Sequence, residues 1–149
     1  MLIAACVATR AMLETLVHHV GSNTPIRSKF QHDHSQPQLD IEQSLQIFRI
    51  VQEATKNMIR HSGAKCMTVV FASRANKLIV SVTDNGFGLE RNRRQRSAGI
   101  GLRIIQARVD RIAASLRIST PIGGGTCIEL SLALPAKLAA AHHLKNDSS

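Results

Sequence analysis

The most regular apolar pattern in this sequence lies between residues 40 and 62 and predicts a helix with one buried face. Four apolar residues follow one another at steps of four, three and four residues, which is the period of an α-helix. They are Ile47, Val51, Ala54 and Met58. The neighbouring apolar residues that are expected to widen this face are Ile41, Leu45, Phe48 and Ile59. Ser62 and Gly63 then end the helix.

Several segments after this helix have the composition or alternation of strands. Residues 66–73 and 78–83 are rich in Val, Ile and Thr and are separated by a short turn, so they predict a hairpin. Residues 117–120 predict a short strand, and residues 126–134 alternate between apolar and polar side chains. The apolar positions of this last segment are Ile128, Leu130, Leu132 and Leu134.

Two more helices and a weaker strand complete the pattern. A helix over residues 1–20 is expected to stop at residues 21–23, and residues 24–30 alternate weakly. A further helix is expected to open at Gly99-Ile100-Gly101. Its predicted apolar face consists of Leu102, Ile105, Val109, Ile112 and Leu116. Helices that bury one face, interleaved with alternating strands, predict a two-layer α/β sandwich.

Length and charge limit the class of protein. A chain of 149 residues is the size of one domain. Its 19 basic and 10 acidic residues leave a net charge of +9, which favours an anionic partner. Aromatic residues make up only 3% of the chain, which argues against binding single-stranded nucleic acid by stacking. No helix-turn-helix pattern supports binding to DNA, so we expect no nucleic-acid partner.

Cysteine usage and hydropathy indicate the compartment. Cys6, Cys66 and Cys127 are too widely spaced for a CxxC metal pair or a disulfide framework, which fits a reducing environment. No apolar run approaches the roughly 18 to 20 residues of a membrane span. The apolar start lacks the basic segment of a signal peptide, and Arg10 interrupts it. We therefore expect a soluble, cytoplasmic chain with no membrane span.

Three polar residues lie four residues apart on the predicted helix over residues 40–62: Glu53, Asn57 and His61. Each step of four rotates the helix by only about 40°, so the three side chains project from one side, next to the apolar face. This pattern has two interpretations. The first is a solvated edge of an amphipathic helix. The second is a binding site in which Glu53 and Asn57 offer oxygens to a hard cation such as Mg²⁺ while His61 lies near an anion.

Three glycine-rich segments follow, and each taken singly is also typical of a plain turn. Residues 84–88, Asp-Asn-Gly-Phe-Gly, end a strand, where Asp84 is placed to accept a hydrogen bond from an exocyclic amine. Residues 99–102, Gly-Ile-Gly-Leu, open a helix, whose amides and dipole attract anions. Residues 123–126, Gly-Gly-Gly-Thr, enter the last strand.

In order along the chain, these features are E-x3-N-x3-H, DNGxG, GxGL and GGGT. Their order and spacing resemble the GHKL, or Bergerat, ATP-binding fold, and more narrowly the catalytic domain of bacterial sensor histidine kinases of the nitrate-sensor type. The resembling stretches are residues 47–64, 82–89, 99–112 and 121–135. The resemblance implies a mixed sheet with helices on one face. It also implies an ATP-binding domain over residues 24–135, a helix or connector over 1–23, and a tail over 136–149 that is expected to fray.

The resemblance further implies ATP and Mg²⁺ as cofactors, with Glu53, Asn57 and His61 as catalytic residues. Asn57 would coordinate Mg²⁺, Glu53 would orient water or the metal, and His61 with Arg60 would face the phosphates. Asp84 would accept a hydrogen bond from the adenine amino group. The other residues implied at the nucleotide are Gly86, Gly88, Gly99, Gly101, Leu102 and Thr126.

The polar segment over residues 89–98 corresponds in the resemblance to a short lid over ATP, with Gly99 and Gly101 at its hinge. The segment is rich in arginine. These arginines are expected either to attract phosphate or to form a solvated basic face.

One feature of such kinases is not evident in the sequence. They carry a phosphoacceptor histidine on a dimerising helix, and neither His18, His19 nor His32 lies in that setting. The resemblance therefore implies transfer of the γ-phosphoryl group of ATP to a histidine on a partner kinase chain or a separate dimerisation domain, with a response regulator downstream. The alternatives are an anti-sigma-type serine kinase of the same fold and a non-catalytic nucleotide-binding module.

Overall fold

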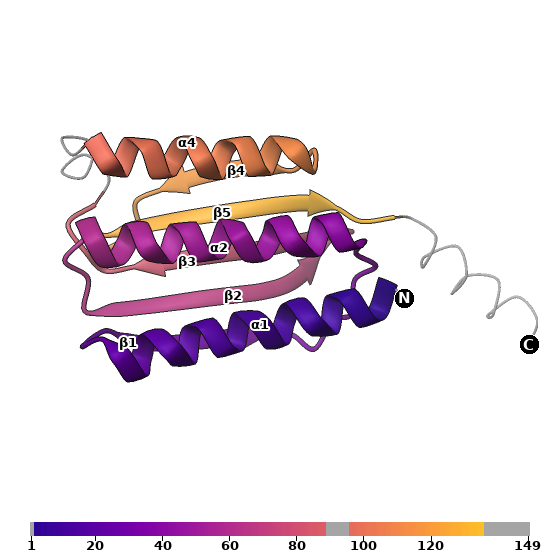
Figure 1. The fold of residues 1–149 in the computed structure, drawn as a ribbon, viewed down its shortest axis with the longest axis horizontal. Helices are drawn as coiled ribbons and strands as arrows, with labels where there is room; N and C mark the ends of the chain where they lie inside the picture. The colour runs from indigo at the N-terminus through magenta and orange to yellow at the C-terminus, as the bar shows by residue number, and fades with distance from the viewer. Residues whose placement is uncertain (1, 89–95, 136–149) are drawn as a thin grey trace, which may run out of the picture.

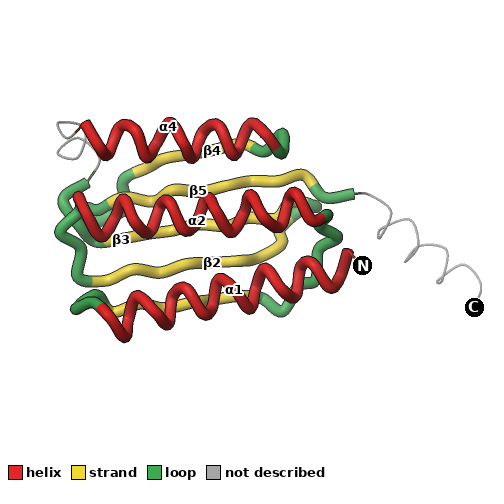
Figure 2. Tube along the Cα trace, viewed as in Figure 1, coloured by secondary structure: helices red, strands yellow, loops and turns green. Residues whose placement is uncertain are grey.

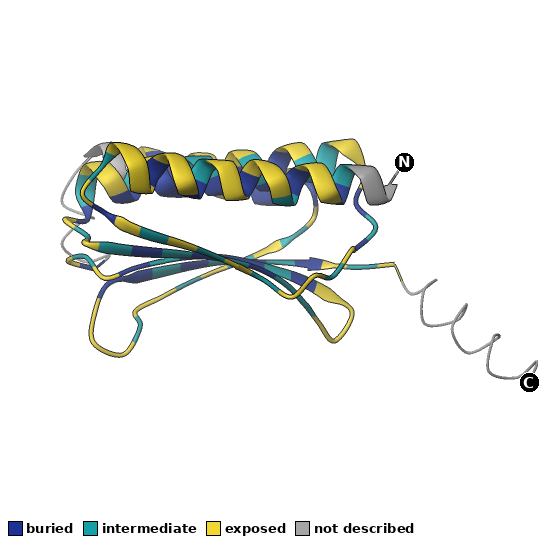
Figure 3. Cartoon of the chain, turned by 90° about the horizontal axis from the view of Figure 1, so that it is seen from below, coloured by how far each residue is buried: buried dark blue, intermediate teal, exposed yellow. Residues whose placement is uncertain are grey.

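A computed structural model describes residues 2–88 and 96–135 of the chain. In this part the molecule has two layers, a twisted five-stranded sheet and a layer of helices that covers one of its faces (Figure 3). The sheet is mixed, because one strand pair is parallel and the other pairs are antiparallel. The predicted two-layer α/β sandwich with helices on one face is confirmed.

The strands lie in the order β1-β2-β3-β5-β4 (Figure 1). Their bounds are β1 Arg27–His32, β2 Cys66–Arg74, β3 Lys77–Asp84, β4 Ser115–Ser119 and β5 Thr126–Ala133. The β2–β3 hairpin turns through Ala75 and Asn76, both with positive φ, as a two-residue hairpin loop of right-handed twist requires. Because β3 pairs with β5, the last residue of β3, Asp84, lies opposite the first residue of β5, Thr126.

Three helices are described: α1 Leu2–Asn23, α2 Ile41–His61 and α4 Arg96–Arg111 (Figure 2). Asp40 begins α2 with a capping box, because its side chain accepts from the Gln43 N–H while the Gln43 side chain accepts from the Asp40 N–H. The predicted core face of α2 is buried against the sheet, and residues of α1, β2, β3, α4 and β5 join the same core.

Several predicted boundaries and core positions are wrong. Three apolar residues of α2 are exposed, because a helix lying on a sheet buries only one stripe. They are Ile41, at 81% exposure, Leu45 and Ile59, whereas Ile50 is buried instead. The helix α1 continues through Gly21 to Asn23. The helix α4 ends at Arg111, so Leu116 lies in β4 and not on a helix.

The start of α4 also differs from the prediction. The helix begins at Arg96, so Gly99 and Gly101 lie inside it and do not open it. Most of the predicted lid, residues 89–95, and the predicted tail, residues 136–149, lie outside the described residues. None of the described helices is long and apolar enough to cross a membrane.

Candidate functional site

The residues of the four motifs gather at one end of the molecule, where α2 ends, β3 ends, α4 begins and β5 begins (Figure 1). This end is at the left of Figure 1. The motif residues meet here because α2 and α4 run antiparallel on the same face of the sheet. The strand β3 ends at the same end of the molecule, with Asp84 opposite Thr126.

At this end, α2 and α4 approach closely at Gly101. A Cβ atom built on Gly101 would lie 3.1 Å from Asn57 Oδ1 and 3.4 Å from Glu53 Oε1. Both of these side chains are half-buried. Any side chain at position 101 would therefore press on the two oxygen-bearing groups of α2, and glycine leaves them room. The structure thus brings Gly101 to Glu53 and Asn57, from which it is more than forty residues away in sequence.

The turn after β3 is tied to the end of α2. Asn85 Oδ1 accepts from the backbone N–H groups of Lys65 and Cys66, at 2.8 and 2.9 Å. The Phe87 N–H donates to the carbonyl of the fully buried Ser62, at 2.7 Å. Gly86 packs so closely on Ser62 that a Cβ would overlap the Ser62 carbonyl oxygen. These contacts fix the turn, and glycine at position 86 is required by the close approach.

Asp84 is the buried carboxyl group of the site. It is 8% exposed, and its Oδ1 accepts from the Gly86 N–H at 2.8 Å. The Thr126 N–H also donates to this carboxyl group. Burial raises the pKa of Asp84 above its usual value, and the two backbone hydrogen bonds oppose this shift in part.

Next to Asp84, the Thr126 hydroxyl is buried at a residue that is 6% exposed, and its Oγ1 makes no hydrogen bond within the described part of the chain. A buried hydroxyl without a partner is costly in a native structure, and it indicates a group that a ligand would satisfy. Gly125 allows this geometry, because it has φ of +95° and a Cβ there would overlap the Asp84 carbonyl oxygen. A Cβ built on Gly88 would lie 3.5 Å from the Gly125 carbonyl oxygen.

The remaining predicted site residues are placed less directly. His61 is the last residue of α2 and is half-buried, and Arg60 beside it is exposed. Leu102 is half-buried and packs against the hydrophobic core, so its side chain helps to hold α4 on the core. Gly99 lies in the first turn of α4 with no atom within 4 Å of the position of a Cβ.

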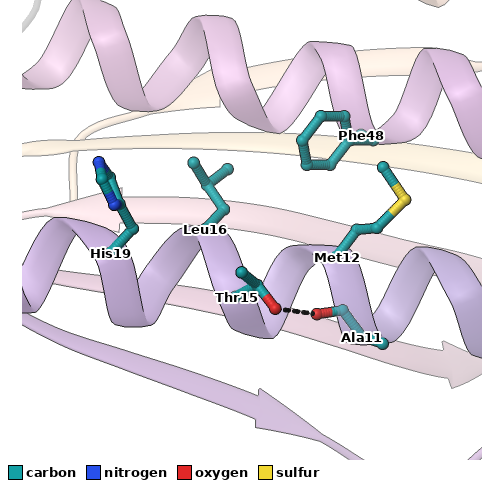
Figure 4. Close-up of a pocket in the computed structure, with 6 residues that line it drawn as sticks. All are labelled: Ala11, Met12, Thr15, Leu16, His19 and Phe48. Carbon is teal, nitrogen blue, oxygen red and sulfur yellow. Dashed lines mark hydrogen bonds between the residues drawn. The ribbon is translucent and has the colours of Figure 1, made fainter.

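A cavity of about 390 Å³ lies elsewhere, between α1 and α2 (Figure 4). It is lined by Ala11, Met12, Thr15, Leu16, His19 and Phe48. None of the motif residues reaches it, and its lining is apolar apart from the Thr15 hydroxyl, which donates to the Ala11 carbonyl, and the His19 ring. This cavity is therefore separate from the candidate site.

The donor set at the candidate site suits a cation that also binds phosphate. Among the described residues, no group of three or more His, Cys, Asp and Glu side chains lies close enough to hold a metal alone. Glu53 and Asn57 supply two neighbouring oxygens on α2, which is an incomplete set for a hard cation. Such an ion needs further oxygens, and nucleotide phosphates with water are its usual source in phosphoryl-transfer sites.

Fold and site together define the class of this protein: a two-layer α/β domain whose motif residues gather at one end of its helix layer. The chain belongs to the family described as histidine kinase-, DNA gyrase B- and HSP90-like ATPases, whose model matches residues 42–136. The matched range contains each motif residue discussed above. The family confirms ATP as the ligand class and makes the chain an ATP-binding domain of the histidine-kinase type.

Curated relatives agree with this assignment. The chain is 28% identical over 123 residues to the sensor histidine kinase ComP of Bacillus subtilis, a match that covers 82% of this chain and 16% of that protein. It is 30% identical over 118 residues to the sensor histidine kinase MctS of Rhizobium johnstonii, covering 78% of this chain and 26% of that protein. The chain thus spans about a quarter or less of the length of these relatives.

Solved structures share the fold. The ATP-binding domain of PrrB from Mycobacterium tuberculosis superposes with a TM-score of 0.68 at 17% identity, covering 85% of this chain and 93% of that one. The histidine kinase AdeS of Acinetobacter baumannii gives the same TM-score at 15% identity, covering 84% and 64%.

Three residues that support the site were not singled out as site residues from the sequence: Ser62, Asn85 and Gly125. Each acts through its backbone position or a backbone hydrogen bond. Two signals were usable: Gly125 lies in the motif of residues 123–126, and an asparagine directly after a strand, such as Asn85, commonly bonds to nearby backbone.

Proposed function

We propose that this chain is the catalytic ATP-binding domain of a two-component sensor histidine kinase, in which the adenine ring of ATP lies over Asp84 and Thr126 and the phosphates lie between α2 and α4. The observation that carries the proposal is the pair formed by a buried carboxyl group and a buried, unpartnered hydroxyl at the joined ends of β3 and β5. A purine with an exocyclic amine satisfies both groups.

The residues of the site divide the work of binding. Asp84 accepts a hydrogen bond from the adenine amino group, and Gly86 and Gly88 let the backbone approach the ring. Thr126 gives its hydroxyl to the same edge of the base. Gly99 lies in the first turn of α4, where the leading N–H groups and the helix dipole attract the triphosphate. Gly101 lies further inside α4 and leaves room for the Asn57 and Glu53 side chains.

The phosphate end requires charge neutralisation, which supplies most of the catalysis in phosphoryl transfer. Asn57 would hold Mg²⁺ by its amide oxygen, Glu53 would orient water or the metal, and Mg²⁺ when bound supplies neutralisation of the phosphate charge. His61 and Arg60, at the end of α2, face the phosphates with positive or hydrogen-bonding groups.

The phosphoryl acceptor that we propose is a histidine outside this chain, on a dimerisation domain or a partner kinase chain, from which a response regulator takes the phosphoryl group. The ATP-binding unit is residues 24–135, and α1 is a connector packed onto it. The proposed site of action is the cytoplasm, and the proposed subfamily is the nitrate-sensor type.

Phosphotransfer tests this function. The chain is incubated with ATP labelled at the γ position, alone and with a separately purified histidine-bearing dimerisation domain of a sensor kinase. We expect no label on the chain alone, and acid-labile, base-stable label on the added domain. Acid-stable label on serine would instead identify the serine-kinase alternative, and absence of transfer with intact ATP binding would identify a non-catalytic module.

A further inference from the structure

A polar network joins α2 and α4 away from the nucleotide end. The Arg108 guanidinium, on α4, donates through Nη1 to Gln46 Oε1 at 3.0 Å. Gln46 Nε2 in turn donates to Glu42 Oε1 at 3.2 Å, and the same oxygen pairs with Arg111 Nε at 2.6 Å. The chain of contacts therefore starts on α4, passes through two residues of α2 and returns to α4.

The two halves of this network differ in burial. The Arg111–Glu42 pair is exposed, so solvent screens it and its contribution is small. Gln46 is only 3% exposed, and Arg108 Nε is buried with no hydrogen-bond partner among the described residues. In the buried half, the positively charged Arg108 guanidinium contacts the neutral Gln46 amide, and the Arg108 Nε–H donor is left without an acceptor among the described residues. Apolar side chains of similar size would not carry this desolvation cost. Packing stability alone does not account for it.

The position of the network suggests what it does. From Gln46 to Glu53 on α2 is seven residues, and from Gly101 to Arg108 on α4 is also seven residues. Seven residues make about two helical turns, or roughly 10.5 Å, and return to nearly the same face. The Arg108–Gln46 bond therefore lies on the same seam between the helices as the contact of Gly101 with Glu53 and Asn57, two turns further along.

We propose that Arg108 is a positioning residue: through Gln46 it fixes the register of α4 on α2, and so holds Gly101 against Asn57 at the phosphate end of the site. Apolar contacts along the seam are not directional and allow the helices to slide or rotate. A hydrogen bond to a buried amide allows one arrangement. A rotation of α4 by one residue would bring the side chain of Ile100 or Leu102 to the place of Gly101 and displace the Asn57 amide.

The inference rests on the proposed role of Asn57, so the experiment first measures the wild-type chain. Affinities for ATP and ADP are determined by calorimetry with and without Mg²⁺, together with the melting temperature. If the wild type binds ATP with no gain from Mg²⁺, the proposed function fails at the metal, independently of Arg108.

The test variant is Arg108→Met, which keeps most of the side-chain stem and removes the donors. We expect the Mg²⁺-dependent gain in ATP affinity to fall by roughly tenfold or more, as for residues that orient a metal ligand. ADP affinity without metal should stay at the wild-type value, because Asp84 lies on β3 and not on the seam. Arg108→Lys, which retains a donor, should restore part of the gain. The matched control is Arg103→Met, on the exposed side of the same helix, with the same loss of charge.

The double variant Arg108→Met with Asn57→Ala should lose no more of the Mg²⁺ effect than Asn57→Ala alone, since both changes act on one group. The proposal is overturned if Arg108→Met keeps the full Mg²⁺ gain. It is also overturned if the variant loses metal-free ADP binding and ATP binding in equal proportion, because that is the result of general destabilisation. Should Arg108→Met fail to fold, Gln46→Met removes the acceptor from the other side and is judged by the same two criteria.

Discussion

Replacing Gly101 by alanine separates the stability of α4 from the function of the site. Inside a helix, alanine is favoured over glycine by about 1 kcal/mol. Against this gain stands the contact with α2, because the new Cβ would lie 3.1 Å from Asn57 Oδ1 and 3.4 Å from Glu53 Oε1. The neighbours must give by a few tenths of an ångström. The Asn57 and Glu53 side chains are half-buried and can do so by rotating away.

We therefore expect Gly101→Ala to fold with a melting temperature equal to or above that of the wild type, and to lose affinity for ATP in the presence of Mg²⁺ by roughly tenfold. Gly99→Ala is the stability control. It lies on the same helix and gains the same helix propensity, and no atom lies within 4 Å of its Cβ position. The difference in unfolding free energy between the two variants thus measures the cost of the contact with α2.

Calorimetric titration of ATP, with and without Mg²⁺, checks the functional half of this prediction. If Gly101→Ala binds Mg²⁺ and ATP as tightly as the wild type, the oxygens beside Gly101 do not hold the metal. If the variant loses metal-free ADP binding to the same degree, the glycine serves the adenine end or the whole fold, and the reasoning from the Asn57 contact is refuted.

Three further outcomes are expected. Asp84→Ala should weaken ATP and ADP alike by about 1 to 3 kcal/mol, measured by titration, and an unchanged ADP affinity in the folded variant would remove Asp84 from the site. Because burial raises the pKa of Asp84, the folded state binds the carboxyl proton of Asp84 more tightly than the unfolded chain does, and the stability from this group is lost as pH rises through the raised pKa. In thermal melts from pH 4 to 7, the melting temperature of Asp84→Ala should therefore rise relative to that of the wild type toward pH 7. A difference in melting temperature that stays constant over this range would contradict the raised pKa. Gly125→Ala should destabilise the chain by several kcal/mol in chemical denaturation, since φ of +95° and the overlap with the Asp84 carbonyl both oppose a side chain; a stability equal to the wild type would show that the turn can rearrange.

The sequence predicts the fold well where one periodicity holds over a whole element. The buried face of α2 and the alternation of β5 follow from such patterns and are confirmed. It fails at Leu116, because the helical spacing of apolar residues continues by chance across the end of α4. Ala113, with φ of 53°, ends that segment although no glycine marks the place.

The candidate site is predictable in its residue types and not in its contacts. The motif order leads to Asp84, Thr126, Asn57 and Gly101 as a set. The contact of Gly101 with Asn57 depends on how α4 packs against α2. The contact of Gly125 with Asp84 depends in the same way on how β5 pairs with β3. Such contacts join residues more than forty positions apart, and no local pattern encodes the distance between them.

The central claim, that this end of the molecule binds ATP through Asp84 and a metal held at Asn57, is tested most directly by one titration series. ATP is titrated into the wild type, Asp84→Ala and Asn57→Ala, each with and without Mg²⁺. We predict that the wild type binds ATP more tightly with Mg²⁺, that Asn57→Ala binds it equally with and without Mg²⁺, and that Asp84→Ala binds it weakly in both conditions. A folded wild-type chain that binds no ATP, or an Asn57→Ala variant that keeps the whole Mg²⁺ gain, would contradict the account.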